Sequence, residues 1–120
     1  MLARILLAED EALIRLLLAE EFTDHGHEVV EASNAEDALR QVAGCGRCDV
    51  LVTDIHMGGK IDGVELARRL RALDPGLPIV FMTGRPGAVA DFGCMGPHGV
   101  LVNKPFTTFD IMCALESVIR

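Results

Sequence analysis

The stretch Val50-Leu51-Val52-Thr53-Asp54 is an uninterrupted apolar run that ends in an aspartate. A run of this kind is typical of a strand covered on both faces, as in a parallel sheet. Three other short runs also end in polar residues: Leu6-Leu7-Ala8 before Glu9-Asp10, Ile79-Val80-Phe81-Met82 before Thr83, and Val100-Leu101-Val102-Asn103 before Lys104. If all four are parallel strands, these polar residues converge at the carboxyl edge of one sheet, where open α/β sheets hold their ligands.

Helical patterns alternate with these strands. Apolar residues recur at helical spacing from Glu11 to about Thr23. This pattern predicts a helix whose inward residues are Ile14, Leu17, Leu18 and Phe22. Residues 28–32 alternate charged and apolar side chains, which predicts a half-buried edge strand. Further helices are expected after Ser33 or Asn34, after Gly63 and after Thr107 or Thr108. Five strand and helix units predict one α/β domain over residues 1–120, a doubly wound parallel sheet.

The helix between the fourth and fifth strands is the weakest of the five. Glycine and proline interrupt the segment from Gly84 to Gly99, and each interior proline costs about 3 kcal/mol of helix stability. We therefore expect only a short or deformable helix around Ala88 to Phe92.

Composition narrows the classes of function. The 120 residues carry a net charge of −7, which argues against non-specific binding to nucleic acid. No apolar stretch approaches the roughly 20 residues that a membrane span requires. The first residues lack the cleavage pattern of a signal peptide, so a cytoplasmic location is the default expectation.

The converging side chains suggest phosphoryl chemistry. Glu9, Asp10 and Asp54 would supply hard oxygen ligands suited to Mg²⁺. A carboxylate can itself be the nucleophile and form an aspartyl phosphate when a metal neutralises the charge that it attacks. Lys104 would add a point charge to the phosphoryl oxygens and the Thr83 hydroxyl a hydrogen bond.

Taken together, the motifs resemble the receiver domain of bacterial two-component response regulators. The resemblance rests on the acidic pair Glu9-Asp10, on Asp54, on Thr83-Gly84 and on Lys104-Pro105-Phe106, and it covers essentially the whole chain. It implies a flavodoxin-like sheet with strand order 2-1-3-4-5 and five helices. It also implies a protein that is no enzyme beyond assisting its own phosphorylation and dephosphorylation.

The resemblance implies a role for each matching residue. Asp54 would be the phosphoacceptor and Asp10 a direct Mg²⁺ ligand, with Glu9 acting through water. The backbone carbonyl of His56 would complete the protein ligands. Thr83 would turn toward the phosphate, and a cis Lys104-Pro105 bond would set the lysine.

Partners follow from the same resemblance. A histidine kinase or a histidine phosphotransfer protein would donate the phosphoryl group, while the downstream protein target stays unknown. Leu13 and Leu16 lie outside the predicted core stripe of the first helix, so we expect them to form the docking patch for that donor. Because nothing follows the last helix, we expect a single-domain, stand-alone receiver.

Two other functions stay open. One is an interaction module that keeps the fold without being phosphorylated, which the Asp54, Asp10 and Lys104 set disfavours. The other is a flavin-binding protein, which would need a neutral phosphate loop where this chain has Glu9-Asp10-Glu11.

Departures from the family pattern affect how a signal would be transmitted. Leu101 stands where receivers usually place an aromatic residue, so we expect output through the stretch from Arg85 to Gly96 instead. The loop after Asp54 reads Met57-Gly58 in place of Met-Pro and has one extra residue before Asp62-Gly63. We expect this loop to be more mobile than its counterparts.

The cysteines and histidines suggest no second site. Cys45-Gly-Arg-Cys48 precedes a strand, so no helix N-terminus lowers a thiol pKa as redox motifs require, and zinc would need two more ligands nearby. Cys113 is predicted to be a small core residue. His25 and His27 are predicted to lie solvated in a turn.

Overall fold

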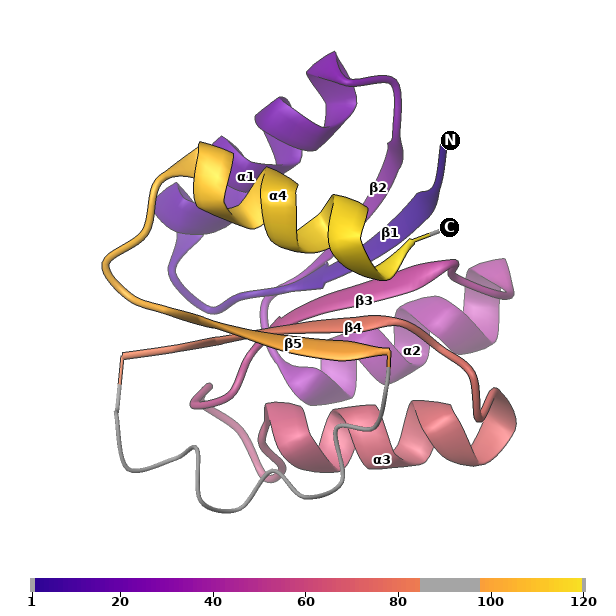
Figure 1. Cartoon of the computed structure of the whole chain (residues 1–120). Coiled ribbons are helices and arrows are strands. Elements are labelled where there is room, and N and C mark those ends of the chain that lie inside the picture. The colour runs from indigo at the N-terminus through magenta and orange to yellow at the C-terminus, as the bar shows by residue number, and fades with distance from the viewer. Residues whose placement is uncertain (1, 85–97, 120) are drawn as a thin grey trace.

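A five-stranded parallel sheet forms the centre of the computed structural model, which describes residues 2–84 and 98–119 (Figure 1). The strand order is β2-β1-β3-β4-β5, as predicted. The strands are β1 (Arg4–Ala8), β2 (Glu28–Ala32), β3 (Val50–Asp54), β4 (Ile79–Thr83) and β5 (Gly99–Asn103). β3 and β4 are buried along their whole length, whereas β2 lies at an edge and is partly exposed. The prediction of a doubly wound α/β sheet is confirmed.

Helices cover both faces of the sheet. Within the described residues they are α1 (Ala12–Asp24), α2 (Ala35–Cys45), α3 (Gly63–Leu73) and α4 (Thr108–Val118). α1 and α4 cover one face and α2 and α3 the other (Figure 1). The short helix expected around residues 88–92, and the output route expected over 85–96, lie outside the described residues. No helix in the described part of the chain has the length and hydropathy to cross a bilayer.

Local sequence accounts for where three helices begin. The Asn34 side chain accepts a hydrogen bond from the Asp37 amide at 2.7 Å, and Asp62 caps α3 in the same way through the Glu65 amide. At α4, Thr107 and Asp110 each accept a hydrogen bond from the other's amide, which forms a capping box. Such caps satisfy amides that have no partner within the helix.

The predictions that Leu17 and Cys113 lie in the core are wrong. Leu17 is 54% exposed, although Ile14, Leu18 and Phe22 pack toward the sheet as predicted. At 100° per residue, Leu17 falls at the margin of the face that those three residues define. Cys113 is exposed because α4 turns Ile111, Met112, Leu115 and Val118 inward, and position 113 lies on the opposite side.

His27 is buried, which contradicts the predicted solvated turn. Its Nδ1 accepts a hydrogen bond from the Ala3 amide at 3.0 Å, so this nitrogen carries no proton. Burial lowers the pKa of His27, and the neighbouring His25 adds to the effect. The ring therefore joins the start of β1 to the start of β2 in its neutral form.

This contact predicts a dependence of stability on pH. The unfolded chain takes up a proton on His27 near the ordinary pKa of about 6.5, whereas the native state resists it. The free energy of unfolding should therefore fall as the pH drops below that value toward the lower native pKa. His27→Asn keeps an acceptor near Nδ1 but does not titrate, so denaturant melts from pH 7.5 to 5 should show a shallower fall. His98→Asn, at an exposed histidine, should leave the slope unchanged; equal slopes in wild type and His27→Asn would refute the assignment.

Candidate functional site

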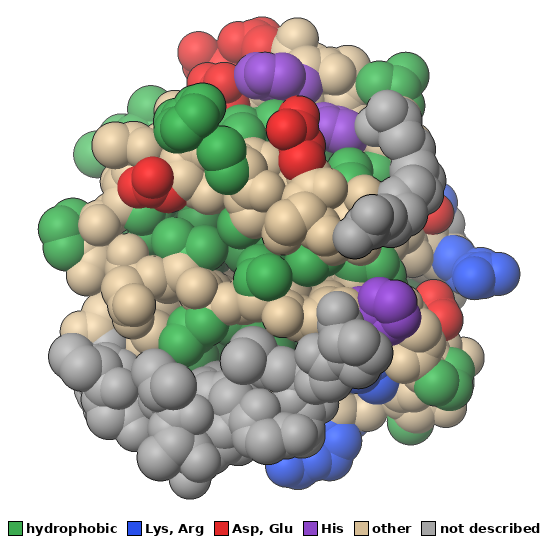
Figure 2. Space-filling model, in the orientation of Figure 1, with side chains coloured by type: hydrophobic (Ala, Val, Ile, Leu, Met, Phe, Trp, Pro, Cys, Tyr) green, Lys and Arg blue, Asp and Glu red, His purple; other side chains and the backbone are tan. Residues whose placement is uncertain are grey.

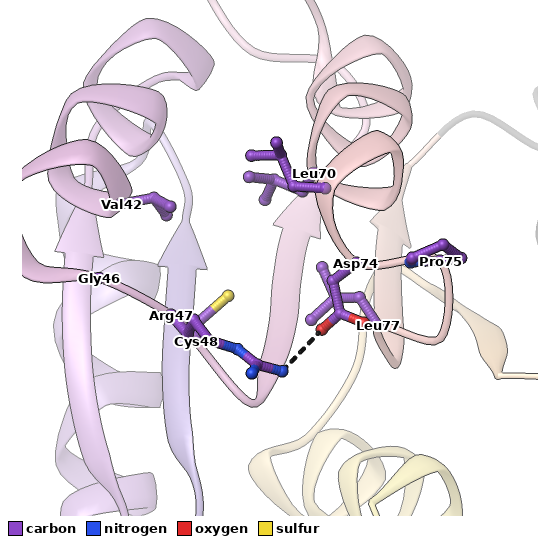
Figure 3. Close-up of a pocket in the computed structure, with 9 residues that line it drawn as sticks. Val42, Gly46, Arg47, Cys48, Leu70, Asp74, Pro75 and Leu77 are labelled. Atoms are coloured by element: carbon purple, nitrogen blue, oxygen red, sulfur yellow. Dashed lines mark ion pairs between the residues drawn. The ribbon is translucent and has the colours of Figure 1, made fainter.

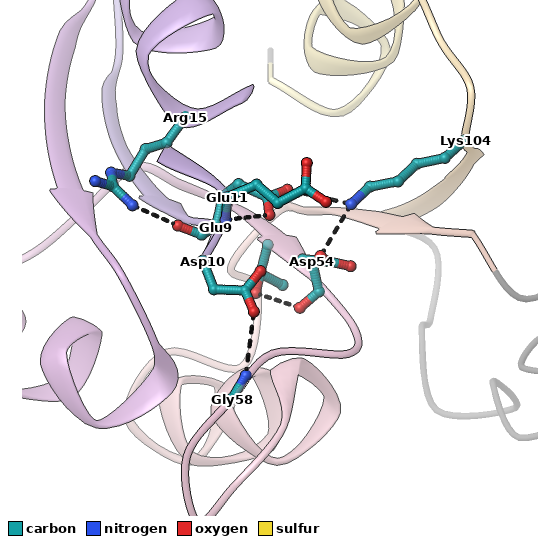
Figure 4. Close-up of polar contacts among 8 residues, drawn as sticks. Glu9, Asp10, Glu11, Arg15, Asp54, Gly58 and Lys104 are labelled. Carbon is teal, nitrogen blue, oxygen red and sulfur yellow. Dashed lines mark hydrogen bonds and ion pairs between the residues drawn. The ribbon is translucent and has the colours of Figure 1, made fainter. Parts of the chain in front are cut away.

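Three carboxylates meet at the carboxyl edge of the sheet. Ala8 and Thr53 are register partners of β1 and β3, so the residues that follow them, Glu9 and Asp54, lie side by side. One oxygen from each of Glu9, Asp10 and Asp54 lies within 4.8 Å of the other two (Figure 4). Glu9 and Asp54 are buried, whereas Asp10 is exposed. The structure thus brings together the three acids that the sequence predicted to converge.

Lys104 reaches this cluster from β5. Thr83 and Asn103 are register partners, and the Lys104 amide donates to the Thr83 carbonyl at 2.7 Å. The Lys104 ammonium then lies 3.0 Å from Asp54 Oδ2 and 3.4 Å from Glu9 Oε1 (Figure 4). The Lys104-Pro105 peptide bond is cis, as the resemblance implied. One ammonium therefore contacts two of the three clustered carboxylates, and the acids outnumber it.

The electrostatics of the cluster reflect this imbalance. Burial raises the pKa of Glu9 to about 7, and the Asp54 carboxylate adds to the effect, while the Glu11 amide and Lys104 oppose it. Burial disfavours the Lys104 ammonium, but its hydrogen bond and attraction to Asp54 outweigh this and raise the Lys104 pKa. Both pKa shifts indicate that additional positive charge would stabilise the ionised carboxylates of this site.

Hydrogen bonds to the backbone hold the first two acids in place. Glu9 Oε2 accepts from the Glu11 amide at 3.1 Å, and Asp10 Oδ2 accepts from the Gly58 amide at 3.3 Å. Arg15 of α1 donates to the Glu9 carbonyl at 2.8 Å and pairs with Glu31 at 3.3 Å. Sequence reasoning missed Arg15, although a lone cation in a leucine-rich helix was a usable signal.

Gly63 lies directly behind Asp54. A Cβ on Gly63 would stand 2.1 Å from the Asp54 carbonyl oxygen and 3.0 Å from the Thr53 hydroxyl. The Gly63 amide donates to the Ile55 carbonyl at 2.9 Å, which fixes the start of α3 against the end of β3. The absence of a side chain at this position allows α3 to approach the strand that carries Asp54. From the sequence, Gly63 is predicted only as the last residue of a glycine-rich loop before the third helix.

The remaining predicted residues lie around the cluster. Thr83 is fully buried at the end of β4, and His56 follows β3 with its side chain exposed. Leu101, which replaces the usual aromatic residue, is partly buried and packs against the core on the α2 and α3 face. Phe106 packs partly buried against the core on the opposite face.

The cluster has the donor set for a small, hard cation. Three carboxylates supply oxygens that lie within 4.8 Å of one another, and oxygen ligands of this kind suit Mg²⁺. The three carboxylates outnumber the single Lys104 ammonium beside them, and this excess of negative charge favours such a cation. The residues present therefore fit the predicted metal.

A cavity of about 340 Å³ lies at the opposite end of the sheet, where Cys48 is found (Figure 3). It lies between the end of α2 and the turn after α3, and an Arg47–Asp74 pair at 3.7 Å bridges its rim. Burial raises the pKa of the Cys48 thiol to about 11, the reverse of what a redox nucleophile needs. This agrees with the prediction that the C-x-x-C is not a redox motif.

Comparisons with known proteins identify the family. The family model of the response regulator receiver domain matches residues 5–116. The response regulator receiver protein CpdR of Brucella abortus is 33% identical over 117 residues, which cover 97% of this chain and 96% of CpdR. The chain therefore belongs to the response regulator receiver family, as the resemblance predicted.

Longer relatives and solved structures agree. The transcriptional regulatory protein TcrA of Mycobacterium tuberculosis is 35% identical over 119 residues, which cover 98% of this chain and 46% of TcrA. The chain thus spans about half the length of that relative. A receiver protein from Sinorhizobium medicae superposes with a TM-score of 0.86 at 33% identity, covering 96% of this chain and 92% of that one. Thermotoga maritima TrrA, solved with Mg²⁺-BeF, superposes with a TM-score of 0.83 at 30% identity, and the match covers 97% of this chain and 98% of TrrA.

Proposed function

We propose that this receiver accepts a phosphoryl group on Asp54 from a phosphohistidine donor and passes the signal on through a change in conformation. The observation that carries the proposal is the placement of Asp54 among Glu9, Asp10 and Lys104. The phosphoryl group that a carboxylate attacks is itself negatively charged, so positive charge has to lie around it. This cluster has both an ammonium and a place for a cation.

Each residue has a specific part in the proposed reaction. An Asp54 carboxylate oxygen forms the new bond to phosphorus, while the bond from phosphorus to the donor imidazole breaks and its electron pair returns to the nitrogen. Lys104, now 3.0 Å from Asp54, then binds a phosphoryl oxygen instead. Thr83 offers its hydroxyl to the phosphate from the end of β4. The protein assists only its own phosphorylation and dephosphorylation.

Mg²⁺ is the proposed cofactor. Asp10 and Asp54 would hold it directly, Glu9 through water, and the His56 carbonyl would be the remaining protein ligand. When bound, the cation neutralises negative charge on the phosphoryl oxygens. TrrA, solved with Mg²⁺ and a fluoride of beryllium, supports this assignment for a similar fold. The cytoplasmic location stays a prediction from the sequence.

The direct test is phosphorylation with a small acyl phosphate or amidophosphate. Wild-type protein should incorporate one phosphoryl group in the presence of Mg²⁺ and none in the presence of a chelator. The product should be labile to alkali, as expected of an aspartyl phosphate. An absence of labelling with Mg²⁺ would favour the alternative function, an interaction module that is not phosphorylated.

The docking site that we propose for the phosphohistidine donor lies beside the acidic cluster. Leu13, Leu16 and Leu17 of α1 are 71%, 57% and 54% exposed, and Phe109 of α4 is 73% exposed. Figure 2 shows hydrophobic side chains at the surface over α1 and α4. A cavity of about 490 Å³ lies between these helices and reaches Lys104. An apolar helix face of the donor would cover this surface and bring its phosphohistidine to Asp54.

Substitutions in this surface should slow phosphotransfer from a protein donor but not labelling by a small donor. Leu13→Glu with Leu16→Glu places charge in the apolar contact, so phosphotransfer from a cognate phosphohistidine protein should fall by about tenfold or more. Labelling by a small donor should not change, because it needs no docking. Leu73→Glu, at a leucine that is 80% exposed on α3, is the matched control and should affect neither reaction. Equal losses with both donors would mean that the variant damages the fold and not a docking surface.

A further inference from the structure

Two carboxylates hold the loop that leads from β3 to α3 at the site. Asp10 accepts from the Gly58 amide at 3.3 Å, and Glu36, in the first turn of α2, accepts from the Lys60 amide at 2.6 Å. Asp10 belongs to the acidic cluster, whereas Glu36 comes from a different helix. The loop is thus fastened on two sides, and Glu36 makes the shorter contact.

The loop backbone is shaped around the Glu36 carboxylate. Gly59 has a φ of +112°, a conformation that side chains other than glycine rarely adopt. A Cβ on Gly59 would stand 2.7 Å from Glu36 Oε1 and 3.1 Å from Oε2, so the carboxylate occupies the space where a side chain would be. Glu36 Oε1 is buried and accepts no hydrogen bond within the described part of the chain. The loop backbone therefore holds the carboxylate through one hydrogen bond, from the Lys60 amide to Oε2, and this bond lowers the pKa of Glu36.

This contact is made in the same loop that departs from the usual receiver pattern. The sequence has one extra residue between Asp54 and Asp62-Gly63, and Gly58, Gly59 and Lys60 fall in that stretch. The added length favours a more mobile loop, but the Glu36 contact supplies an anchor that opposes such motion. The anchor matters because the His56 carbonyl and the Gly58 amide both lie in this loop.

We propose that Glu36 is a positioning residue for phosphorylation of Asp54, which holds the Gly58–Lys60 backbone so that the loop stays at the acidic cluster when Asp10 engages a cation. The inference rests on the proposed function. Asp10 alone would hold the loop weakly, because a bound cation would compete with the Gly58 amide for the same carboxylate. Glu36 is free of that competition because it lies outside the acidic cluster.

The test compares Glu36→Ala and Glu36→Gln with Glu65→Ala. Glu65 is a matched control: it also lies in the first turn of a helix, but it pairs with Arg68 and Arg69 of its own helix. Without Mg²⁺, Glu36→Ala should speed amide exchange at Lys60 by about tenfold, the effect expected from losing a hydrogen bond to a charged group. Glu65→Ala should leave exchange at Lys60 unchanged.

Labelling by a small phosphodonor across a Mg²⁺ titration gives the functional readout. Glu36→Ala should raise the Mg²⁺ concentration for half-maximal rate by about tenfold, with the rate at saturation largely kept. Glu36→Gln should lie between wild type and Glu36→Ala, because its amide oxygen still accepts from Lys60 but carries no charge. A general loss of stability would not shift the Mg²⁺ dependence in this graded way. Should Glu36→Ala not fold, the same comparison is made with Glu36→Gln.

Each outcome decides the matter. Faster exchange at Lys60 with an unchanged Mg²⁺ dependence would make Glu36 a structural contact only and would overturn the inference. Unchanged exchange at Lys60 would overturn it as well. If wild-type protein incorporates no phosphate at all, it is the proposed function that fails, whereas normal wild-type labelling with indistinguishable Glu36 variants rejects the positioning role alone.

Discussion

Asp54→Asn is expected to abolish incorporation of phosphate from a small donor, to the level of a sample without donor. An amide oxygen is not a carboxylate nucleophile, so the new bond to phosphorus cannot form. The variant should still fold, because asparagine has nearly the same shape and the substitution removes one of the three clustered negative charges. Measurement of acid-stable, alkali-labile phosphate by intact mass spectrometry gives the answer directly.

Asp24→Asn is the control for this substitution. It makes the same chemical change at an exposed residue at the end of α1, far in the fold from the acidic cluster, and should be labelled like wild type. Undiminished labelling of Asp54→Asn would falsify the assignment of Asp54 as phosphoacceptor. If peptide mapping found the label on a different carboxylate, that residue of the cluster would be the phosphoacceptor instead of Asp54.

Parallel strand topology explains why the acidic cluster was predictable. The apolar runs at β1, β3 and β4 are buried strands, and the chain direction alone places the residue after each strand at the same edge. Glu9 follows β1, Asp54 ends β3 and Lys104 follows β5, so these three residues converge at that edge of the paired strands. No knowledge of side-chain packing was needed for that prediction.

Residues judged by helical spacing or by their place in a turn were less predictable. Leu17 and Cys113 are both apolar, and both are exposed, because a helix at the surface of a sheet buries only one stripe of its residues. His27 was assigned to solvent because it lies in a turn, yet the start of β1 covers it and supplies a hydrogen bond from Ala3. Turn position alone does not show which neighbouring strand packs over a side chain.

Supporting residues of the site depend on contacts between distant segments. Arg15 binds the Glu9 carbonyl, and Glu36 binds the Lys60 amide 24 residues away in the sequence. The lone cation of α1 singles out Arg15, but the partner of neither contact can be read from the sequence, because each partner is a backbone group that nearly every residue has. The close approach at Gly63 belongs to the same class, since the atoms that exclude a side chain come from β3.

Gly63→Ala is expected to be strongly destabilising, by about 2 to 4 kcal/mol in the free energy of unfolding. Its Cβ would stand 2.1 Å from the Asp54 carbonyl oxygen, a backbone atom that cannot rotate away, so α3 or the end of β3 must move. Because Gly63 is buried and its amide donates to Ile55, the strain cannot be relieved by exposure to solvent. Chemical denaturation of the variant and of wild type measures the difference.

Gly44→Ala is the matched control, since nothing lies within 4 Å of the added Cβ and the residue belongs to α2. Alanine favours a helix over glycine, so this variant should be as stable as wild type or more stable, by about 0.5 kcal/mol. The pair thus separates the intrinsic preference for alanine from the steric contact at Gly63.

Any shift of β3 that accommodates the Gly63→Ala methyl group also displaces Asp54 relative to Lys104, so the surviving folded fraction should be phosphorylated more slowly than wild type. A Gly63→Ala protein with wild-type stability would show that α3 can withdraw from β3 at little cost, and that the approach of α3 does not position Asp54.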